Sequence, residues 1–340
     1  MSETGIHPRD IGARSAGAPG PARSMRWLFR WETLLILAIL LDFGINTRAS
    51  PYFLDPWTLS DVTVSVAEKA TVALAMAFLV MAGEIDISVG GIIALASVVM
   101  GLVARTGMPL PVVVMTGIGV GFLAGCCNGA LVTIGRVPSI VATIGTMTLF
   151  RGIAYAVLGD GVLKTYPAGF SWLGQGYVLG PVSFELVLFC LLAMLAAVLL
   201  HLTAFGRRVV ATGSNPEAAR MSGIATGRLR FALFVAVGTA AGIASVLLTS
   251  RLGSTRPSIA QGWELEIVTM VILGGVAIEG GVGTILGVVL AAILMGLVTF
   301  GLGLLNVPGI VMSVVTGAML ILVVAVPAAL RILGFTRGRR

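Results

Sequence analysis

Two acidic residues, Glu84 and Asp86, stand in the glycine-flanked segment GEIDISVGG at 83–91, between two long apolar runs. The 35 residues from Ala70 to Ala104 reach about 52 Å as one helix, whereas two full membrane crossings need roughly 60 Å and a turn. The sequence therefore predicts a break in the helix, with both acids below the membrane interface. Buried carboxylates are costly and are usually kept for a task, such as binding a coupled ion. An ordinary turn in the cytosolic headgroup zone is the alternative.

A second informative segment is the polar stretch 205–230, the longest that is expected on the cytosolic face. Asn215, Pro216 and Glu217 follow the order of a helix start, with a capping side chain, a proline and an acid. Gly223 suits the end of such a helix. A short helix parallel to the membrane could dock into a groove of another protein. The alternative is a solvated loop whose arginines only fix the topology.

A third segment, LGGVAIEGG at 273–281, places four glycines and Glu279 at a helix junction. A hinge and a close helix crossing both fit this pattern, and the crossing is favoured. The candidate residues for either role are Gly274, Gly275, Glu279 and Gly280.

Residues for other kinds of chemistry are missing from the sequence. Its three cysteines lie in apolar runs and its two histidines stand apart, so no metal site is expected. Neither Lys69 nor Lys164 follows a glycine, which excludes the phosphate-binding loop of ATPases. We therefore expect no metal, no cofactor and no enzyme activity with recognisable chemistry.

The elements that must position these segments are membrane helices. Of the 340 residues 57% are hydrophobic and 11% are charged, with a mean hydropathy of +1.03, against about 45–50% and about 25% in globular domains. Such a chain needs membrane lipid around it, which excludes soluble enzymes, disordered proteins and disulfide scaffolds. Its net charge of +7 is assigned to loops that set the orientation, and no nucleic acid partner is expected.

The predicted fold is an all-α, polytopic integral membrane protein with about ten transmembrane helices. A flexible cytosolic tail at 1–25 and a basic cytosolic tail at 334–340 flank the membrane domain, 26–333. The predicted spans are 31–47, 66–83, 87–104, 110–134, 139–158, 183–204, 229–249, 264–278, 284–304 and 309–330.

Charged residues test this topology. With both termini cytosolic, 15 of the 22 lysines and arginines fall inside and five fall outside, as the positive-inside rule requires. Two spans are weak: 66–83 begins with Glu68 and Lys69, and 264–278 is short with two acids at its head. The segments 83–103 and 275–298 also resemble each other, which suggests an internal repeat of the kind common in transporters.

Four motifs together resemble the ribose-type sugar permeases of ABC importers. They are GEIDISVGG, VPSIVATIGTMTLFRGI at 137–153, FGRRVVATGSNPEAARMSGI at 205–224 and VTMVILGGVAIEGGVGTILGV at 268–288. They occur in the family's order, and the resemblance covers roughly residues 30–330. Glu84 and Ile87 depart from the pattern, which usually has glycine and leucine there.

The resemblance implies the transmembrane subunit of an importer in the bacterial inner membrane, for a small sugar of the ribose, rhamnose or autoinducer-2 type. Such subunits pair as homodimers or heterodimers, bind two cytosolic ABC ATPase subunits and receive a periplasmic sugar-binding protein. Residues of the translocation path or gate would be Glu84, Asp86, Ser88 and Asn128. Residues that contact the ATPase would be Gly206, Arg207, Asn215, Glu217, Ala218, Ala219, Ser222 and Gly223.

Three alternatives stay open on the sequence. An ion-coupled secondary transporter would use Glu84 and Asp86 to bind its ion. An integral-membrane enzyme would need a clustered histidine or aspartate pair, which we do not find. The third is a branched-chain amino acid ABC permease of the related superfamily. The form of GEIDISVGG favours a sugar permease over it.

Overall fold

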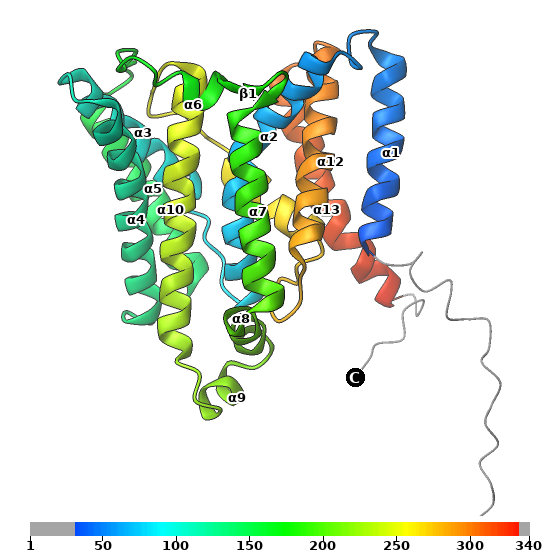
Figure 1. The fold of residues 1–340 in the computed structure, drawn as a ribbon. Coiled ribbons are helices and arrows are strands. Elements are labelled where there is room, and N and C mark those ends of the chain that lie inside the picture. The colour runs from blue at the N-terminus through cyan, green and yellow to red at the C-terminus, as the bar shows by residue number, and fades with distance from the viewer. Residues whose placement is uncertain (1–30, 333–340) are drawn as a thin grey trace, which may run out of the picture.

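The computed structural model describes residues 31–332, so the predicted tails at 1–25 and 334–340 lie outside the described residues. The described chain is a bundle of helices that run side by side (Figure 1). The long elements are α1 (Trp31–Ala49), α2 (Pro56–Met81), α3 (Val89–Arg105), α4 (Leu110–Thr133), α5 (Ser139–Leu158), α7 (Phe184–Leu202), α10 (Thr226–Leu252), α12 (Ile285–Leu304) and α13 (Gly309–Ile332). The shorter helices are α6 (Trp172–Gln175), α8 (Ala204–Ser214), α9 (Pro216–Met221) and α11 (Trp263–Leu273).

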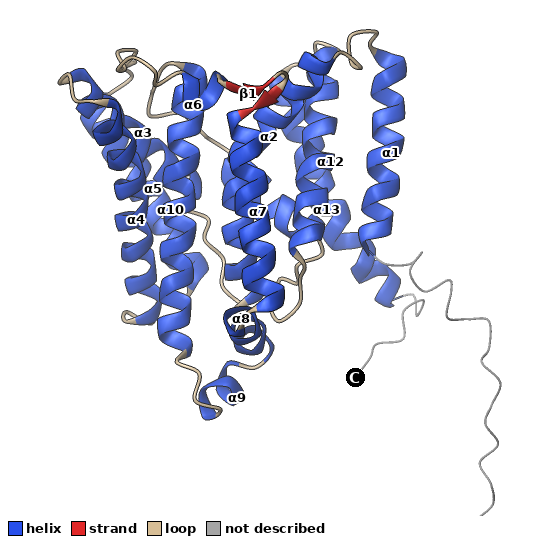
Figure 2. Ribbon diagram, in the orientation of Figure 1, coloured by secondary structure: helices blue, strands red, loops and turns tan. Residues whose placement is uncertain are grey.

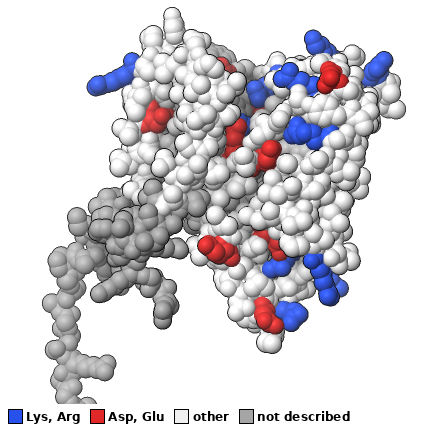
Figure 3. Space-filling model, turned by 180° about the vertical axis from the view of Figure 1, so that it is seen from behind, with Lys and Arg blue, Asp and Glu red and all other residues white. Residues whose placement is uncertain are grey.

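Each predicted span overlaps a helix, and six helices are long and apolar enough to cross a membrane. These six are α2, α4, α5, α7, α10 and α12. Helix α3 is apolar but shorter, and residues 309–322 of α13 are apolar. On the face that Figure 3 shows, charged side chains gather toward the two ends and leave a largely uncharged band between them. The chain is therefore a mostly helical, multi-pass membrane protein.

Helix α2 begins ten residues before the predicted start at 66, at Pro56. Asp55 caps it, because its side chain accepts hydrogen bonds from the backbone N–H groups of Trp57 and Thr58. The prediction was wrong because it treated Glu68 and Lys69 as a helix boundary. Both side chains lie inside the bundle and form ion pairs with other helices, so the helix continues through them.

Two helices stop short inside the bundle. Helix α2 ends at Met81 and the chain stays irregular over 82–88, which confirms the predicted break at GEIDISVGG. Helix α11 has 11 residues and ends at Leu273, not at 278, and the chain is irregular over 274–284. Gly275, Gly280 and Gly281 adopt positive φ there, a conformation that side chains with a Cβ rarely tolerate.

The polar stretch 205–230 is mostly helical. Asn215 caps α9 as predicted, since its Oδ1 accepts from the N–H groups of Glu217 and Ala218 at 3.1 and 3.0 Å. The preceding helix α8 was not predicted. At the opposite end of the bundle, α6 and a hairpin of β1 (Tyr177–Leu179) and β2 (Val182–Ser183) form a small cap (Figure 2).

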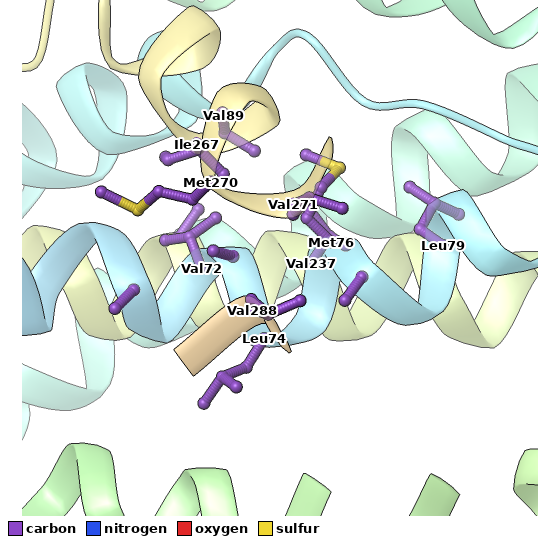
Figure 4. Close-up of a cluster of buried hydrophobic side chains, with 14 of the residues drawn as sticks. Val72, Leu74, Met76, Leu79, Val89, Val237, Ile267, Met270, Val271 and Val288 are labelled. Atoms are coloured by element: carbon purple, nitrogen blue, oxygen red, sulfur yellow. The ribbon is translucent and has the colours of Figure 1, made fainter. Parts of the chain in front are cut away.

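The apolar core surrounds α2, which is buried at almost every position from Val66 to Met81. Val72 and Met76 of α2 pack with Val237 of α10, Met270 of α11 and Val288 of α12 (Figure 4). Because α11 ends inside the bundle, its short apolar stretch is enclosed by longer helices. The core therefore holds both interrupted helices, α2 and α11, against each other.

Helices α4 and α10 cross in backbone contact. A Cβ on Gly125 would lie 2.6 Å from the carbonyl oxygen of Phe234, and one on Gly242 would lie 2.9 Å from that of Gly117. Gly121 and Gly238 face each other in the same crossing. Small residues at such spacing let membrane helices approach closely, so this pair forms a tight unit.

Candidate functional site

The two irregular segments, 82–88 and 274–284, meet near the end of the bundle that carries α8 (Figure 1). The N–H of Gly281 donates to the carbonyl oxygen of Met81 at 2.8 Å. A Cβ on Gly280 would lie 3.0 Å from the nitrogen of Gly83, so only glycine fits this approach. The two segments of the sequence repeat are thus direct neighbours where their helices break.

Helix α8 packs on this contact through its own glycine, Gly213. A Cβ there would lie 2.5 Å from the nitrogen of Gly281 and 2.9 Å from the carbonyl carbon of Met81. A Cβ on Gly281 would lie 3.0 Å from the Cα of Ser214. We call the backbone contacts of 81–83, 213–214 and 280–281 the three-way junction. No side chain separates the three backbone segments of this junction. A displacement of α8 would therefore press directly on both irregular segments, 82–88 and 274–284.

Asp86, Ser88 and Asn128, three of the residues that the sequence assigned to a path or gate, lie together, and all three are fully buried. The Asp86 carboxylate accepts from the N–H of Ser88 at 2.8 Å, from its hydroxyl at 2.6 Å and from Asn128 Nδ2 at 3.0 Å. Asn128 Nδ2 also donates to Ser88 Oγ at 2.7 Å. These bonds hold the turn before α3 and fasten 82–88 to α4. In the conformation described, the cluster holds the backbone and does not face solvent.

Glu84 points away from this cluster. Its carboxylate pairs with Arg230, near the start of α10, at an Nη1–Oε1 distance of 3.0 Å. The pair borders a cavity of about 360 Å³, which Arg136 and Ser139 also line. Ser139 Oγ accepts from the N–H of Ile85 at 3.5 Å. The two acids of one motif therefore belong to two sites, and Glu84 ties the break to α10.

Arg230 was missed as a site residue, because it was interpreted only as a residue that sets the topology. Its guanidinium is partly buried, and its Nε has no hydrogen-bond partner in the part of the chain that the structure describes. The signal in the sequence was Glu84 itself, a charge where the family usually has glycine and one that needs a nearby cation when buried.

The predicted coupling residues divide into an exposed and a buried group. Arg207, Asn215, Glu217, Ala218, Ser222 and Gly223 are exposed on α8, α9 and the turn that follows. Glu217 and Arg220 form an exposed ion pair at 3.6 Å. Gly206 and Ala219 are buried, and Gly206 lies against the backbone of Leu200. The exposed residues are accessible to a partner, whereas the buried two pack the helices that carry them.

The glycines after α11 lie in close contact with neighbouring elements. A Cβ on Gly274 would lie 2.7 Å from the Cα of Val288 in α12. Gly275 leaves room for the ring of Trp31, whose Nε1 donates to the carbonyl oxygen of Leu273 at 2.6 Å. This bond satisfies a carbonyl that the end of α11 leaves free. Glu279 is exposed, so its side chain does not take part in the crossing.

A network of charged side chains inside the bundle was also missed. Arg251 of α10 binds Glu68 of α2 with two hydrogen bonds, of 2.8 and 2.9 Å. Lys69 pairs with Glu266 of α11 at 2.5 Å. Glu185 of α7 is buried without a hydrogen-bond partner among residues 31–332. Ionisable groups inside a membrane bundle are functional candidates by default, and these lie along the helices that frame the core.

Comparisons with known proteins identify the family. The family model described as "Branched-chain amino acid transport system / permease component" matches residues 58–324. The chain belongs to this permease family. The permease is 33% identical over 295 residues to the ribose import permease protein of Bacillus subtilis (strain 168), which covers 86% of this chain and 89% of the relative.

Two further relatives carry other substrate names. The permease is 34% identical to the L-arabinose ABC transporter permease protein of Azospirillum brasilense, over 91% of each chain. It is 33% identical to an autoinducer 2 import system permease protein of Yersinia enterocolitica, over 87% of this chain and 91% of the relative. No solved structure matches. These relatives confirm the resemblance to ribose-type permeases of ABC importers, and they are transport permeases, not enzymes.

Proposed function

We propose that this permease is the transmembrane subunit of an ABC importer that carries a small sugar of the ribose, arabinose or autoinducer-2 class across the bacterial inner membrane. A separate cytosolic ATPase supplies the energy, and a periplasmic binding protein delivers the sugar. The relatives with these printed substrates each align over most of the chain, which supports the proposal. None of these relatives is named for an amino acid or for ion-coupled transport.

The orientation follows from the charges. Five arginines lie between residues 207 and 230, at the end of the bundle that carries α8 and α9. The positive-inside rule makes this the cytosolic end. With about ten crossings both termini are cytosolic, and α6 with the hairpin faces the periplasm. Two such chains, identical or different, form the transport unit.

The observation that supports coupling best is the three-way junction. Exposed residues of α8 and α9 present a surface to a cytosolic partner, and Gly213 of α8 touches both interrupted segments through backbone atoms. A partner that pulls or tilts α8 thereby moves the end of α2 and the segment that joins α11 to α12. Closing of two ATPase subunits can in this way alternate the access of the interior.

In this proposal the predicted gate residues keep the segment 82–88 in place. Asp86, Ser88 and Asn128 fasten this segment to α4, and Glu84 fastens it to Arg230. An ion-coupled mechanism would need these acids free to exchange an ion. Each acid instead has hydrogen-bond or ion-pair partners within the protein, which favours the ATP-driven mechanism.

Reconstitution in liposomes tests the proposal. The permease, its ATPase and the binding protein are incorporated together, and uptake of radiolabelled ribose, arabinose and rhamnose is followed with and without ATP. We expect uptake of at least one sugar that needs all three components. Uptake by the permease alone, driven by a proton or sodium gradient, would show a secondary transporter.

A further inference from the structure

An apolar crevice of about 410 Å³ opens between α7 and α10, with α2 as its floor. Helix α2 packs against both α7 and α10, whereas α7 and α10 scarcely contact each other (Figure 1). The α10 wall is a stripe with the spacing of one helix face, Leu233, Ala236, Ala240 and Ile243. Leu195 of α7 borders the opening and is 53% exposed. The crevice therefore opens sideways from two helices that are long enough to cross the membrane.

The crevice leads toward a second pocket of different chemistry. Phe205, at the start of α8, lines both pockets. The second pocket also has a volume of about 410 Å³ and is bordered by Arg208 of α8 and Arg228 of α10, and it is also lined by Ser222 and Gly223 of the predicted ATPase contact. Leu229 of this pocket and Leu233 of the crevice lie one turn apart on α10. An apolar site and a basic site are thus continuous along one helix face.

Both arginines are free to bind an anion. Arg208 and Arg228 are exposed, and neither has an ion-pair or hydrogen-bond partner within residues 31–332. They lie at the end of the bundle where the cytosolic-leaflet headgroups are expected. Two cations at that depth, directly below an apolar crevice, complement a molecule with an anionic head and a long apolar chain.

We propose that an anionic phospholipid of the cytosolic leaflet occupies this site. One acyl chain fills the crevice between α7 and α10, and the phosphate lies between Arg208 and Arg228. A helix of a second protein fits less well, because about 410 Å³ holds roughly one turn of a helix that is 10 Å wide. The site is independent of the sugar that the permease carries.

The test measures binding of dioleoyl phosphatidylglycerol to the purified permease by native mass spectrometry, with phosphatidylcholine as the neutral lipid. We expect one phosphatidylglycerol to stay bound and phosphatidylcholine to bind about tenfold more weakly. The double variant Arg208→Gln/Arg228→Gln should weaken phosphatidylglycerol by about tenfold or more. Ala236→Trp fills the crevice without changing any charge and should abolish the same binding event.

The matched control is Arg207→Gln/Arg136→Gln, which removes two cations from the same end of the bundle but from other pockets. It should keep the bound phosphatidylglycerol. Equal loss in the control, or equal binding of phosphatidylcholine, would overturn the proposal. A disulfide dimer formed by Leu195→Cys in native membranes, in a variant whose Cys126, Cys127 and Cys190 are replaced by serine, would also overturn it, because the crevice would then face a second copy of the chain.

Discussion

Replacement of Gly213 by alanine tests the three-way junction most directly. Gly213 lies in the regular helix α8, where alanine itself is well tolerated, so the effect comes from space alone. The added Cβ would stand 2.5 Å from the nitrogen of Gly281, and ordinary contact begins at 3.4 Å. Helix α8 must therefore move away from the segment 280–281 by about 0.9 Å, the difference between these two distances, and away from the carbonyl oxygen of Met81, which the Cβ would meet first, by more.

The expected cost follows from this overlap. Forcing an extra carbon into a packed site typically costs about 1–3 kcal/mol. Alanine gains up to about 1 kcal/mol over glycine in a helix, which offsets part of that cost. The variant should thus fold but lose between nothing and about 3 kcal/mol of stability. Its main defect should be in transport, because α8 no longer contacts the two breaks together.

Gly227→Ala is the matched control. Gly227 lies at the start of α10 at the same end of the bundle, and a Cβ there has open space. Both variants are reconstituted with the ATPase and the binding protein, and ATP hydrolysis and sugar uptake are measured on the same liposomes. We expect Gly213→Ala to hydrolyse ATP with little uptake and Gly227→Ala to resemble the wild type. Equal uptake per ATP in the two variants would refute the coupling role of the junction.

Three further predictions concern charges. Glu84→Gln and Arg230→Gln should each destabilise the protein, and the double variant should lose less than the sum by about 1 kcal/mol, as measured by thermal unfolding. Arg251→Met leaves Glu68 buried without its hydrogen-bonded cation and should lower the free energy of unfolding by about 3–5 kcal/mol. Adding Glu68→Gln to this variant should restore most of the lost expression and thermal stability. Glu217→Lys changes an exposed side chain, so the free energy of unfolding should change by no more than about 0.5 kcal/mol, while ATP-driven uptake falls. Unchanged uptake would show that Glu217 is not part of the docking surface.

Local signals in the sequence predicted much of the fold. The apolar runs located the helices, and the length available between Ala70 and Ala104 predicted the break at GEIDISVGG. The Asn215-Pro216 start of α9 was also predictable, since a cap acts within one turn of its own helix. Asp86, Ser88 and Asn128 were placed together by resemblance to a family and not by any local rule.

Contacts between distant residues could not be predicted in this way. Glu68 and Lys69 look like a helix boundary until their partners Arg251 and Glu266 are known, almost two hundred residues away. Gly213 was not singled out, because its importance lies in the backbone of two other segments. A pattern along one chain reports periodicity and caps, whereas it does not report which side chain faces which.

The glycine crossing of α4 and α10 has a consequence for how the transporter changes shape. Backbone contact leaves these two helices no room to slide or tilt independently, so they should travel as one rigid body. On its other side α10 scarcely touches α7, and the crevice lies there. Relative motion between the α4–α10 pair and α7 should therefore occur along the α7–α10 boundary. A lipid that enters or leaves this boundary would then set how readily the permease opens.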